Sequence, residues 1–501
     1  MLVKTFGSAV HGVEAFPITI EVSITTGTHY TLVGLADNVV KESLHRIEMA
    51  ISSIGLRMPR RRIVINLAPA DIRKTGAGFD LPIAVAILAA SGQINRPEQL
   101  AAYLMMGELA LDGSILPVKG TLPMAIRARE DDFLGMLVSK QNESEAGMVS
   151  KLKVYGVKNL REVVQFFNQS THVIEPVCIY TRDEFYKNQR ISELDFADVK
   201  GQEGAKRAMQ VAAAGGHNIL MIGPPGAGKT MLAKRLPGIL PPLSIGEALE
   251  TTRIYSVSDN PYILNGLISQ RPFRSPHHTI SNVALVGGGS IPQPGEISLA
   301  HNGVLFLDEL GEFRRSVLDV MRQPLEDRKI QIGRARMTLT FPANFMLVAA
   351  MNPYTGPSRY KNQFMNKVSG PLLDRIDIQL AVEQISFFDM ERADKGLCSE
   401  ELRKGVVAAR DRQKVRFVDC PGVFTNAQMS SRLVREICTL DDSARKLLYG
   451  HMQKYGLSSR AHDRILKVAR TIADIADSEK IELAHVAEAI YYRSLDMQTS
   501  G

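Results

Sequence analysis

The sequence predicts an α/β protein in which a domain with a parallel sheet is preceded by an α+β domain and followed by a helical domain. The apolar run 219–222 is typical of a buried strand, and it breaks into a glycine-rich loop that leads into a segment of helical periodicity. Strand–loop–helix order of this kind builds parallel α/β sheets. Strand-like alternation dominates the first 165 residues, and helical periodicity dominates after residue 389.

Length and composition fit a multidomain globular protein. The 501 residues are enough for about two to four domains. Hydrophobic residues make up 45% and charged residues 23%, which is ordinary for a chain that buries a core. We divide the chain into an α+β domain at 1–165, a linker at 166–190, an α/β domain at 191–390 and a helical domain at 391–501.

Charge and cysteine content narrow the partners and the location. The formal net charge of +7 suits a polyanionic partner such as nucleic acid, although 60 basic against 53 acidic residues is also compatible with an ordinary surface. We find no apolar stretch in the sequence long enough to span a membrane. The four cysteines are scattered without a Cys-x-x-Cys pair, which favours a reducing compartment. We therefore expect a cytoplasmic protein with no membrane partner.

The α+β domain is predicted from its alternating segments. Residues 2–6 and 18–24 alternate as half-buried strands do, and residues 39–51 place their apolar side chains on one helical face. The Asp112-Gly113 pair lies between two strand-like runs and predicts a hairpin turn. These elements are enough to form a core of their own.

The central domain begins with a phosphate-binding motif. Residues 223–230 match G-x-x-x-x-G-K-[ST], and both flanks have the strand and helix patterns that the motif requires; Pro237 should end the helix. Glycines let backbone N–H groups turn toward phosphate oxygens at the positive end of a helix. Lys229 then supplies a positive charge to the outer phosphates, and the Thr230 hydroxyl is placed to ligate Mg²⁺. The motif predicts ATP and Mg²⁺ as cofactors. The candidate nucleotide-binding residues are Gly223, Pro224, Pro225, Gly226, Ala227, Gly228, Lys229 and Thr230.

Two further strands are predicted to carry polar residues at their ends. The apolar run 304–307 is followed by Asp308 and Glu309, and the run 345–350 is followed by Asn352. Because ligands bind at the carboxyl ends of parallel strands, Asp308 is placed to hold the Mg²⁺–nucleotide and Glu309 to polarise an attacking water. Asn352 is a candidate to orient that water or to contact the γ-phosphate.

Five segments together resemble the AAA+ ATPases. They are residues 223–230, 304–309, 345–353, 370–377 and 458–464. The last two segments contain arginines, whose fork geometry and permanent charge suit a transferring phosphate; each arginine by itself is also compatible with an ordinary solvated or salt-bridged side chain.

The resemblance is closer than the superfamily. Residues 273–281, 287–289 and 294–303 resemble the magnesium-chelatase-like branch, and with the first domain the whole chain resembles the ComM/YifB family of bacterial branch-migration helicases. His277 and His278 lie in the first of these segments. Because no further ligand is spaced nearby, we expect them to structure their loop and not to bind a metal.

The resemblance implies roles for three polar residues. Asn352 matches sensor 1, and Arg460 matches sensor 2 in the helical lid. Arg375 matches the arginine finger, which reaches the nucleotide of the neighbouring subunit. A finger acting in trans implies a homo-oligomeric ring, with a hexamer as the expected size. The candidate catalytic residues are Lys229, Asp308, Glu309, Asn352, Arg375 and Arg460.

The first domain resembles the Lon-protease-like fold through residues 73–81 and 107–120. Where that family has its nucleophilic serine, this chain has Gly78, and residues 121–127 contain no lysine to act as a base. Peptide hydrolysis by such a dyad needs both groups. We therefore interpret this domain as a non-proteolytic relative that serves binding or assembly.

A basic hairpin is the main candidate for DNA contact. Residues 328–340 predict a β-hairpin between the strand of the acid pair and the strand of Asn352, where related ring helicases place a pore hairpin. Cations repeated around a ring would hold phosphates without reading sequence. Arg57 and residues 60–62 form a second candidate patch. The candidate DNA contacts in the hairpin are Lys329, Arg334 and Arg336.

These features together predict an ATP-driven ring motor, an AAA+ P-loop domain with a helical lid, preceded by an α+β Lon-protease-like domain. We expect it to act on branched or single-stranded DNA and to drive branch migration in recombination or natural transformation. Two alternatives stay open at this point: an ATPase motor subunit of a metal-chelatase-type remodelling complex, and a nucleotide-gated assembly switch.

Overall fold

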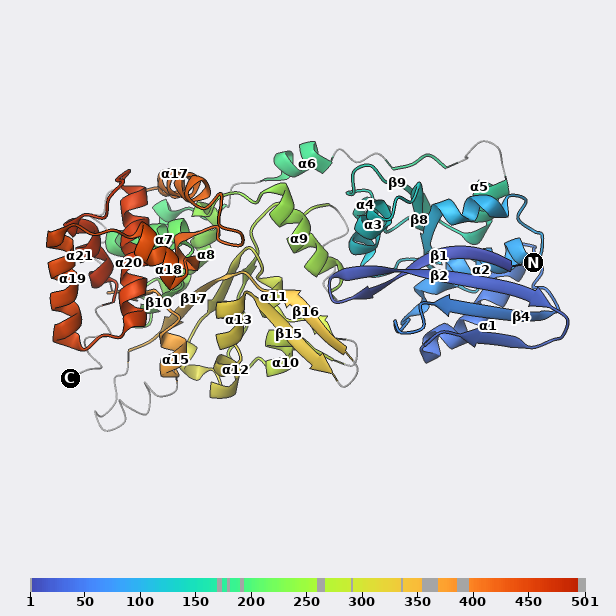
Figure 1. The fold of residues 1–501 in the computed structure, drawn as a ribbon, viewed down its shortest axis with the longest axis horizontal. Helices are drawn as coiled ribbons and strands as arrows, with labels where there is room; N and C mark the ends of the chain where they lie inside the picture. The colour runs from blue at the N-terminus through green and yellow to red at the C-terminus, as the bar shows by residue number, and fades with distance from the viewer. Residues whose placement is uncertain are drawn as a thin grey trace. The chain divides into compact units, whose positions relative to one another are not determined.

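The chain forms two compact units. The computed structural model describes residues 2–168, 174–177, 181–189, 193–258, 266–289, 292–334, 337–353, 368–384 and 396–493. The first unit contains Met1–Asn188 and Ile245–Ile268, and the second contains Gln189–Ser244 and Ser269–Gly501. Figure 1 shows the elements of both, coloured from blue at the N-terminus to red at the C-terminus.

The first unit is built on a seven-stranded sheet in the order β3-β4-β2-β1-β5-β8-β9. Strands β1 and β2 pair antiparallel from Leu2 opposite Ser23 to His11 opposite Glu14, whereas β5, β8 and β9 pair in parallel. Because side chains alternate between the faces of a strand, the alternating sequence predicts this half-buried sheet. The strands are β1 (Leu2–His11), β2 (Glu14–Thr25), β3 (Tyr30–Val33), β4 (Arg62–Ala68), β5 (Tyr103–Met106), β8 (Gly135–Ser139) and β9 (Lys153–Val157).

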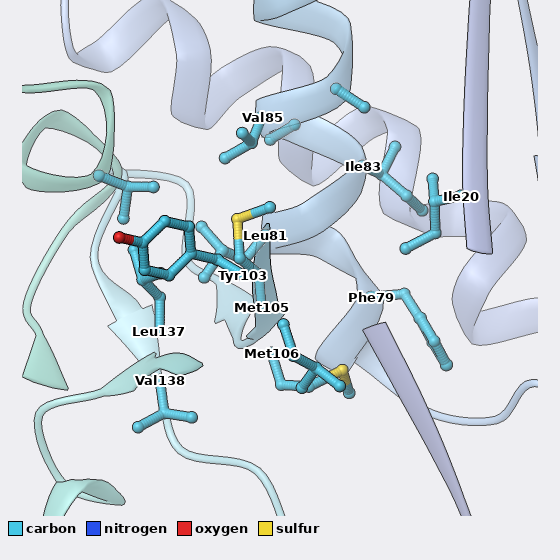
Figure 2. Close-up of a cluster of buried hydrophobic side chains, with 14 of the residues drawn as sticks. Ile20, Phe79, Leu81, Ile83, Val85, Tyr103, Met105, Met106, Leu137 and Val138 are labelled. Atoms are coloured by element: carbon cyan, nitrogen blue, oxygen red, sulfur yellow. The ribbon is translucent and has the colours of Figure 1, made fainter. Parts of the chain in front are cut away.

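Helix α2 (Asp80–Ala90) occupies the core of this unit. Its residues from Asp80 to Ala89 are all buried, as expected for a helix that is apolar on every side. Figure 2 shows Leu81 and Ile83 of this helix in a cluster of buried apolar side chains that includes Ile20 of β2 and Met105 of β5. The other helices of the unit are α1 (Asn38–Ser53), α3 (Thr121–Glu130), α4 (Glu143–Ala146), α5 (Leu160–Asn168), α6 (Thr181–Asn188) and α9 (Ile245–Ser256).

The predicted elements of the first domain are confirmed. The strands expected at 2–6 and 18–24 lie within β1 and β2, and the helix expected at 39–51 lies within α1. The predicted hairpin is formed by β6 (Glu108–Leu109) and β7 (Ile115–Leu116). Its turn residue Gly113 has a φ of +82°, a conformation that favours glycine.

Helix α9 belongs to the first unit, although its sequence lies within the predicted central domain at 191–390. The Ser256 hydroxyl donates to the Glu145 carboxylate, and the Ser256 carbonyl accepts from the Gly120 N–H (3.0 Å). Arg253 Nη2 donates to the Val13 carbonyl (3.0 Å). Burial raises the pKa of Glu145, so its hydrogen bond with Ser256 satisfies a carboxyl group that lies away from water. These contacts explain why α9 packs with the N-terminal part of the chain.

The second unit contains a five-stranded parallel sheet in the order β11-β14-β17-β10-β18. Its central strands are apolar without alternation because both faces are covered. The strands are β10 (Ile219–Ile222), β11 (Phe273–Arg274), β14 (Val304–Leu307), β17 (Met346–Met351) and β18 (Ile378–Ala381).

Helices and a hairpin surround this sheet. Helix α8 continues to Ile239, so Pro237 lies inside its last turn instead of ending it, and the Leu240 N–H still donates to the Leu236 carbonyl (3.3 Å). Strands β15 (Lys329–Arg334) and β16 (Met337–Pro342) form the predicted hairpin, beside α13 in Figure 1. Two short strands also pair, β12 (Gly287–Gly288) with β13 (Gln293–Pro294). The helices are α7 (Glu203–Gly215), α8 (Lys229–Ile239), α10 (Asn282–Val286), α11 (Glu296–Leu299), α12 (Arg315–Asp319), α13 (Arg322–Asp327) and α15 (Gly370–Leu373).

The C-terminal part is helical, as predicted, and forms one unit with the sheet. Helices α17 and α20 both pack on α7. Asp474 of α20 is fully buried and accepts hydrogen bonds from Arg416 and Asn426. These helices are α17 (Ser399–Arg416), α18 (Ser431–Ile437), α19 (Asp442–Tyr455), α20 (Ser459–Ile475) and α21 (Leu483–Tyr491), drawn in orange and red in Figure 1.

The buried ion pair of the first unit gives a stability prediction. Arg46 Nε and Nη2 donate to the Asp80 carboxylate at 2.7 and 3.0 Å, and Asp80 is fully buried. Burial raises the pKa of Asp80 to about 6, although Arg46 acts in the opposite direction. Arg46→Ala should destabilise the unit by about 3–5 kcal/mol at pH 8, because it leaves a buried carboxylate unpaired. The loss should be smaller at pH 5, where Asp80 takes up a proton.

Hydrogen exchange of the α2 amides in a urea series measures this loss at both pH values. Arg127→Ala is the control, because the Arg127–Asp131 pair lies on the surface and should contribute under about 1 kcal/mol. Equal losses for Arg46→Ala at pH 5 and pH 8 would contradict the electrostatic explanation.

Candidate nucleotide-binding site

The phosphate loop follows β10 directly and leads into α8. The Gly223 N–H donates to the carbonyl of Met351 on β17 (3.2 Å), which fixes the start of the loop beside that strand. Gly226 and Gly228 have φ values of +80° and +85°, and a Cβ at either position would meet no atom within 4 Å. The two glycines therefore serve backbone conformation, and they leave open space beside the loop.

Lys229 and Asn352 are brought together at the edge of the sheet. Lys229 Nζ donates to the carbonyls of Gly223 (2.6 Å) and Pro224 (2.9 Å) and to Asn352 Oδ1 (3.0 Å). Burial lowers the pKa of Lys229, and the nearby Asp308 opposes this effect. The ammonium group is held by neutral oxygens, so its charge is available to an anion in the loop.

Thr230 and Asp308 meet at the same edge. The Thr230 hydroxyl donates to Asp308 Oδ2 (2.7 Å), and Asp308 Oδ1 accepts from the Glu309 N–H (2.9 Å). A hydroxyl and a carboxylate are hard oxygen ligands of the kind that Mg²⁺ prefers. In the described part of the chain no three His, Cys, Asp or Glu side chains gather as a metal cage. Mg²⁺ takes few protein ligands and is completed by phosphate and water.

Glu309 is in contact with a histidine that the sequence did not connect with the site. Glu309 has a φ of +52°, and its Oε2 lies 3.3 Å from His278 Nδ1. The His277 ring lies tilted by 34° against the His278 ring, with centroids 4.0 Å apart, and the Phe313 ring meets His278 in a T-shaped arrangement with centroids 6.4 Å apart. The expected loop-structuring role therefore describes His278 only in part. The sequence offered one sign of this contact: His278 follows β11 closely, and β11 lies next to β14, whose end carries Glu309.

Gln202 is a second residue that the sequence analysis missed. It has a φ of +57° just before α7, and its Nε2 donates to the carbonyls of Ala227 (3.3 Å) and Glu383 (2.6 Å). Gln202 therefore borders the phosphate loop. No spacing signal in the sequence connects a position 25 residues upstream with Ala227.

The two candidate arginines differ in their surroundings. Arg375 donates to the Glu326 carboxylate and to the Pro371 carbonyl. Arg460 is exposed in the first turn of α20. Among the described residues, neither makes a hydrogen bond or ion pair with residues 223–230.

The candidate DNA contacts are only partly described. Lys329 is exposed and pairs with Pro342 at the base of the hairpin, not at its tip, because β15 begins there. The last described pair of the ladder, toward the tip, is Arg334 opposite Met337. The Arg334 side chain and all of Arg336 lie outside the described residues.

The Lon-like position of the first unit carries no nucleophile. A Cβ on Gly78 would lie 2.9 Å from Met106 Cε and 3.1 Å from Val118 Cγ1. A serine there would need these side chains to move.

Strand order and site together define the class. The parallel order β11-β14-β17-β10-β18, with a phosphate loop after β10, an acid pair after β14 and a polar amide after β17, is that of a AAA+ nucleotide-binding domain.

Comparison with protein families gives the same class. Residues 195–390 match the family described as magnesium chelatase, subunit ChlI, and residues 396–493 match its C-terminal family. Residues 20–142 match subunit ChlI of Mg-chelatase.

Full-length relatives define the family more narrowly. The chain is 43% identical to the competence protein ComM of Haemophilus influenzae, over 99% of this chain and 98% of that protein. It is 44% identical to YifB of Salmonella typhimurium, over 97% and 96%. It also shares 31% identity with Lon protease 2 of Bacillus subtilis, over 30% of this chain and 28% of that protein. The chain belongs to the ComM/YifB family of magnesium-chelatase-like AAA+ proteins. Of the helices in the described residues, none is long and apolar enough to cross a membrane.

The start of the loop gives a testable prediction. A Cβ on Gly223 would lie 2.1 Å from the Val382 carbonyl oxygen, so the backbone beside β18 would have to shift. Gly223→Ala should therefore weaken binding of a fluorescent ATP analogue by about tenfold or more, because loop and strand no longer fit. Gly204→Ala, in open space on α7, is the matched control and should leave binding unchanged. Wild-type affinity in Gly223→Ala would contradict the loop geometry.

Proposed function

We propose that this protein is an ATP-hydrolysing ring motor that moves on DNA and drives branch migration. The observation that carries the proposal is the pair of contacts Lys229–Asn352 and Thr230–Asp308. They gather a positive charge, a polar amide and two hard oxygen ligands around one loop. Phosphoryl transfer needs little more than positioning and charge neutralisation, and these groups supply both.

Each residue has a defined part in the proposed hydrolysis. Lys229 binds the outer phosphates, while Thr230 and Asp308 hold Mg²⁺, which neutralises charge on the phosphate oxygens. Glu309 polarises the attacking water, and Asn352 orients it beside the γ-phosphate. Lys229 leaves its contacts with the loop carbonyls when the phosphates arrive, because the anion is the stronger partner.

Arg375 is proposed to act on the nucleotide of the neighbouring subunit. It makes no contact with its own phosphate loop, and its position supports a role in trans. The Glu326 carboxylate would hold the guanidinium until a neighbour's phosphate replaces it. Arg460 in the helical lid would contact the nucleotide from its own subunit. Sites shared in this way need a head-to-tail interface between subunits, and we propose that this interface closes into a hexameric ring.

DNA is the proposed partner. The relative ComM is named a competence protein, and the net charge of +7 suits a polyanion. The β15–β16 hairpins would surround a central channel and hold phosphates without reading sequence. The family description as magnesium chelatase favours a second candidate, the motor subunit of a chelatase-type remodelling complex. A nucleotide-gated assembly switch is the third.

One experiment separates the three candidates. The purified protein should hydrolyse ATP faster with DNA and should move a synthetic four-way junction. Glu309→Gln should still bind ATP but turn over about 100-fold or more slowly, because the base is lost while the phosphate loop is intact. ATPase activity that does not respond to DNA would favour the chelatase-type motor. ATP binding without turnover in the wild-type protein would favour the switch.

The shared site has a separate test. Arg375→Ala should bind ATP normally and lose turnover by about 1,000-fold or more, as expected for an arginine finger. Lys229→Ala should lose ATP binding but keep its own Arg375. Mixing the two variants should restore part of the activity, because a Lys229→Ala subunit supplies the arginine that its neighbour needs. Mixed rings without activity would contradict the shared site.

A further inference from the structure

Asn218, the residue before β10, joins three segments that are far apart in the sequence. Its side-chain Nδ2 donates to the carbonyl of Arg375 (3.0 Å), and its Oδ1 accepts from the N–H of Leu347 on β17 (2.9 Å). Its backbone carbonyl accepts from the N–H groups of Asp377 and Ile378, both at 3.0 Å. The backbone of the candidate arginine finger is therefore fastened to the strand that carries the phosphate loop.

His217 fastens the same segment to the helical domain. Its ring is fully buried, with Nδ1 3.2 Å from Asp377 Oδ2 and Nε2 2.8 Å from Thr471 Oγ1 on α20. Arg464 of α20 also approaches Asp377 (3.8 Å). Burial opposes ionisation of Asp377, but the hydrogen bond from His217 and the charges of Arg464 and Lys467 lower its pKa. A charged, buried carboxylate with these partners is costly to separate from them.

Strand β10 connects this junction with the nucleotide site. It is hydrogen-bonded to β17 on one side and β18 on the other, so it moves as part of the sheet. Its carboxyl end opens into the phosphate loop at Gly223, and β17 ends near Asn352. Asn218 and His217 therefore lie between the Arg375 backbone and both the strand of the phosphate loop and α20.

We propose that His217 and Asn218 are positioning residues that couple each subunit's own nucleotide site to the Arg375 that it presents to the next subunit. This inference rests on the proposed function, because it takes Arg375 to act in trans. Asn218 sets the position of the Arg375 backbone, and His217 ties that position to α20, the helix that carries Arg460. Nucleotide occupancy in one site then controls turnover in the next.

Asn218→Asp in the full-length protein tests this coupling. Aspartate keeps the oxygen that accepts from Leu347 but cannot donate to the Arg375 carbonyl, so it breaks one link and keeps the other. We expect kcat for ATP to fall about tenfold or more, because the finger is misplaced. KM and ring assembly should stay within about twofold of wild type, because the substrate-binding loop is unchanged. Mixing with Lys229→Ala subunits should restore turnover.

The mixing result decides between this inference and the proposed function. If Arg375→Ala is restored by Lys229→Ala but Asn218→Asp is not, Asn218 acts on its own subunit's site, and the coupling is overturned while the motor stands. If mixing restores neither variant, Arg375 does not act in trans, and both the shared site and the coupling are wrong.

Two further variants guard against a folding defect. Asn159→Asp is the matched control, because Asn159 Oδ1 accepts from the Glu162 N–H and aspartate keeps this bond; its turnover should equal wild type. If Asn218→Asp does not fold, Asp377→Asn takes its place, since it keeps an oxygen for His217, removes the charge and puts an NH2 group in place of the oxygen nearest Arg464. The kcat for ATP should fall in Asp377→Asn and recover on mixing with Lys229→Ala subunits. A fall that mixing does not reverse would overturn the coupling.

Discussion

The parallel pairing of β17 with β10 on one side and β14 on the other is the constraint on which the candidate site depends. The register places Ile222 opposite Met351 and Leu307 opposite Ala349. Ladder hydrogen bonds therefore make three strands end at one edge of the sheet. The phosphate loop, the acid pair and Asn352 follow these ends directly. Long loops do not have to fold onto one another to form the site, because the sheet has already placed its parts.

The electrostatics of the site follow from this geometry. Lys229 is buried at the sheet edge, where burial lowers its pKa, and its hydrogen-bond partners are two carbonyls and an amide oxygen. The Asp308 carboxylate accepts hydrogen bonds from the Thr230 hydroxyl and the Glu309 N–H. The Lys229 ammonium and the Asp308 carboxylate therefore have different hydrogen-bond partners. A Mg²⁺–polyphosphate, which carries both signs of charge, matches such an arrangement.

The first unit has a glycine, Gly78, where its resemblance to the Lon-protease-like fold places a serine. A Cβ at Gly78 would require the Met106 and Val118 side chains to move, whereas the sheet, the buried helix α2 and the β6–β7 hairpin are complete. Helix α9 follows the helix of the phosphate loop closely along the chain. Only residues 240–244 separate it from α8, the helix of the phosphate loop, and it is held in the first unit through Glu145. A binding or assembly role of the first unit would therefore be linked to the nucleotide-binding domain by this short segment of the chain.

The sequence by itself determined the local features: the phosphate loop, the strand before it, the acid pair, the alternating strands of the first domain and the helical C-terminal part. Each of these is written in consecutive residues, as backbone preference or periodicity. Only the tertiary structure decided that α9 belongs to the first unit, that His278 reaches Glu309, that Lys329 lies at the base of its hairpin, and that Asn218 holds Arg375. These contacts join residues distant in the chain, and no local pattern specifies them, because they depend on which strand neighbours which and on where buried polar groups find partners.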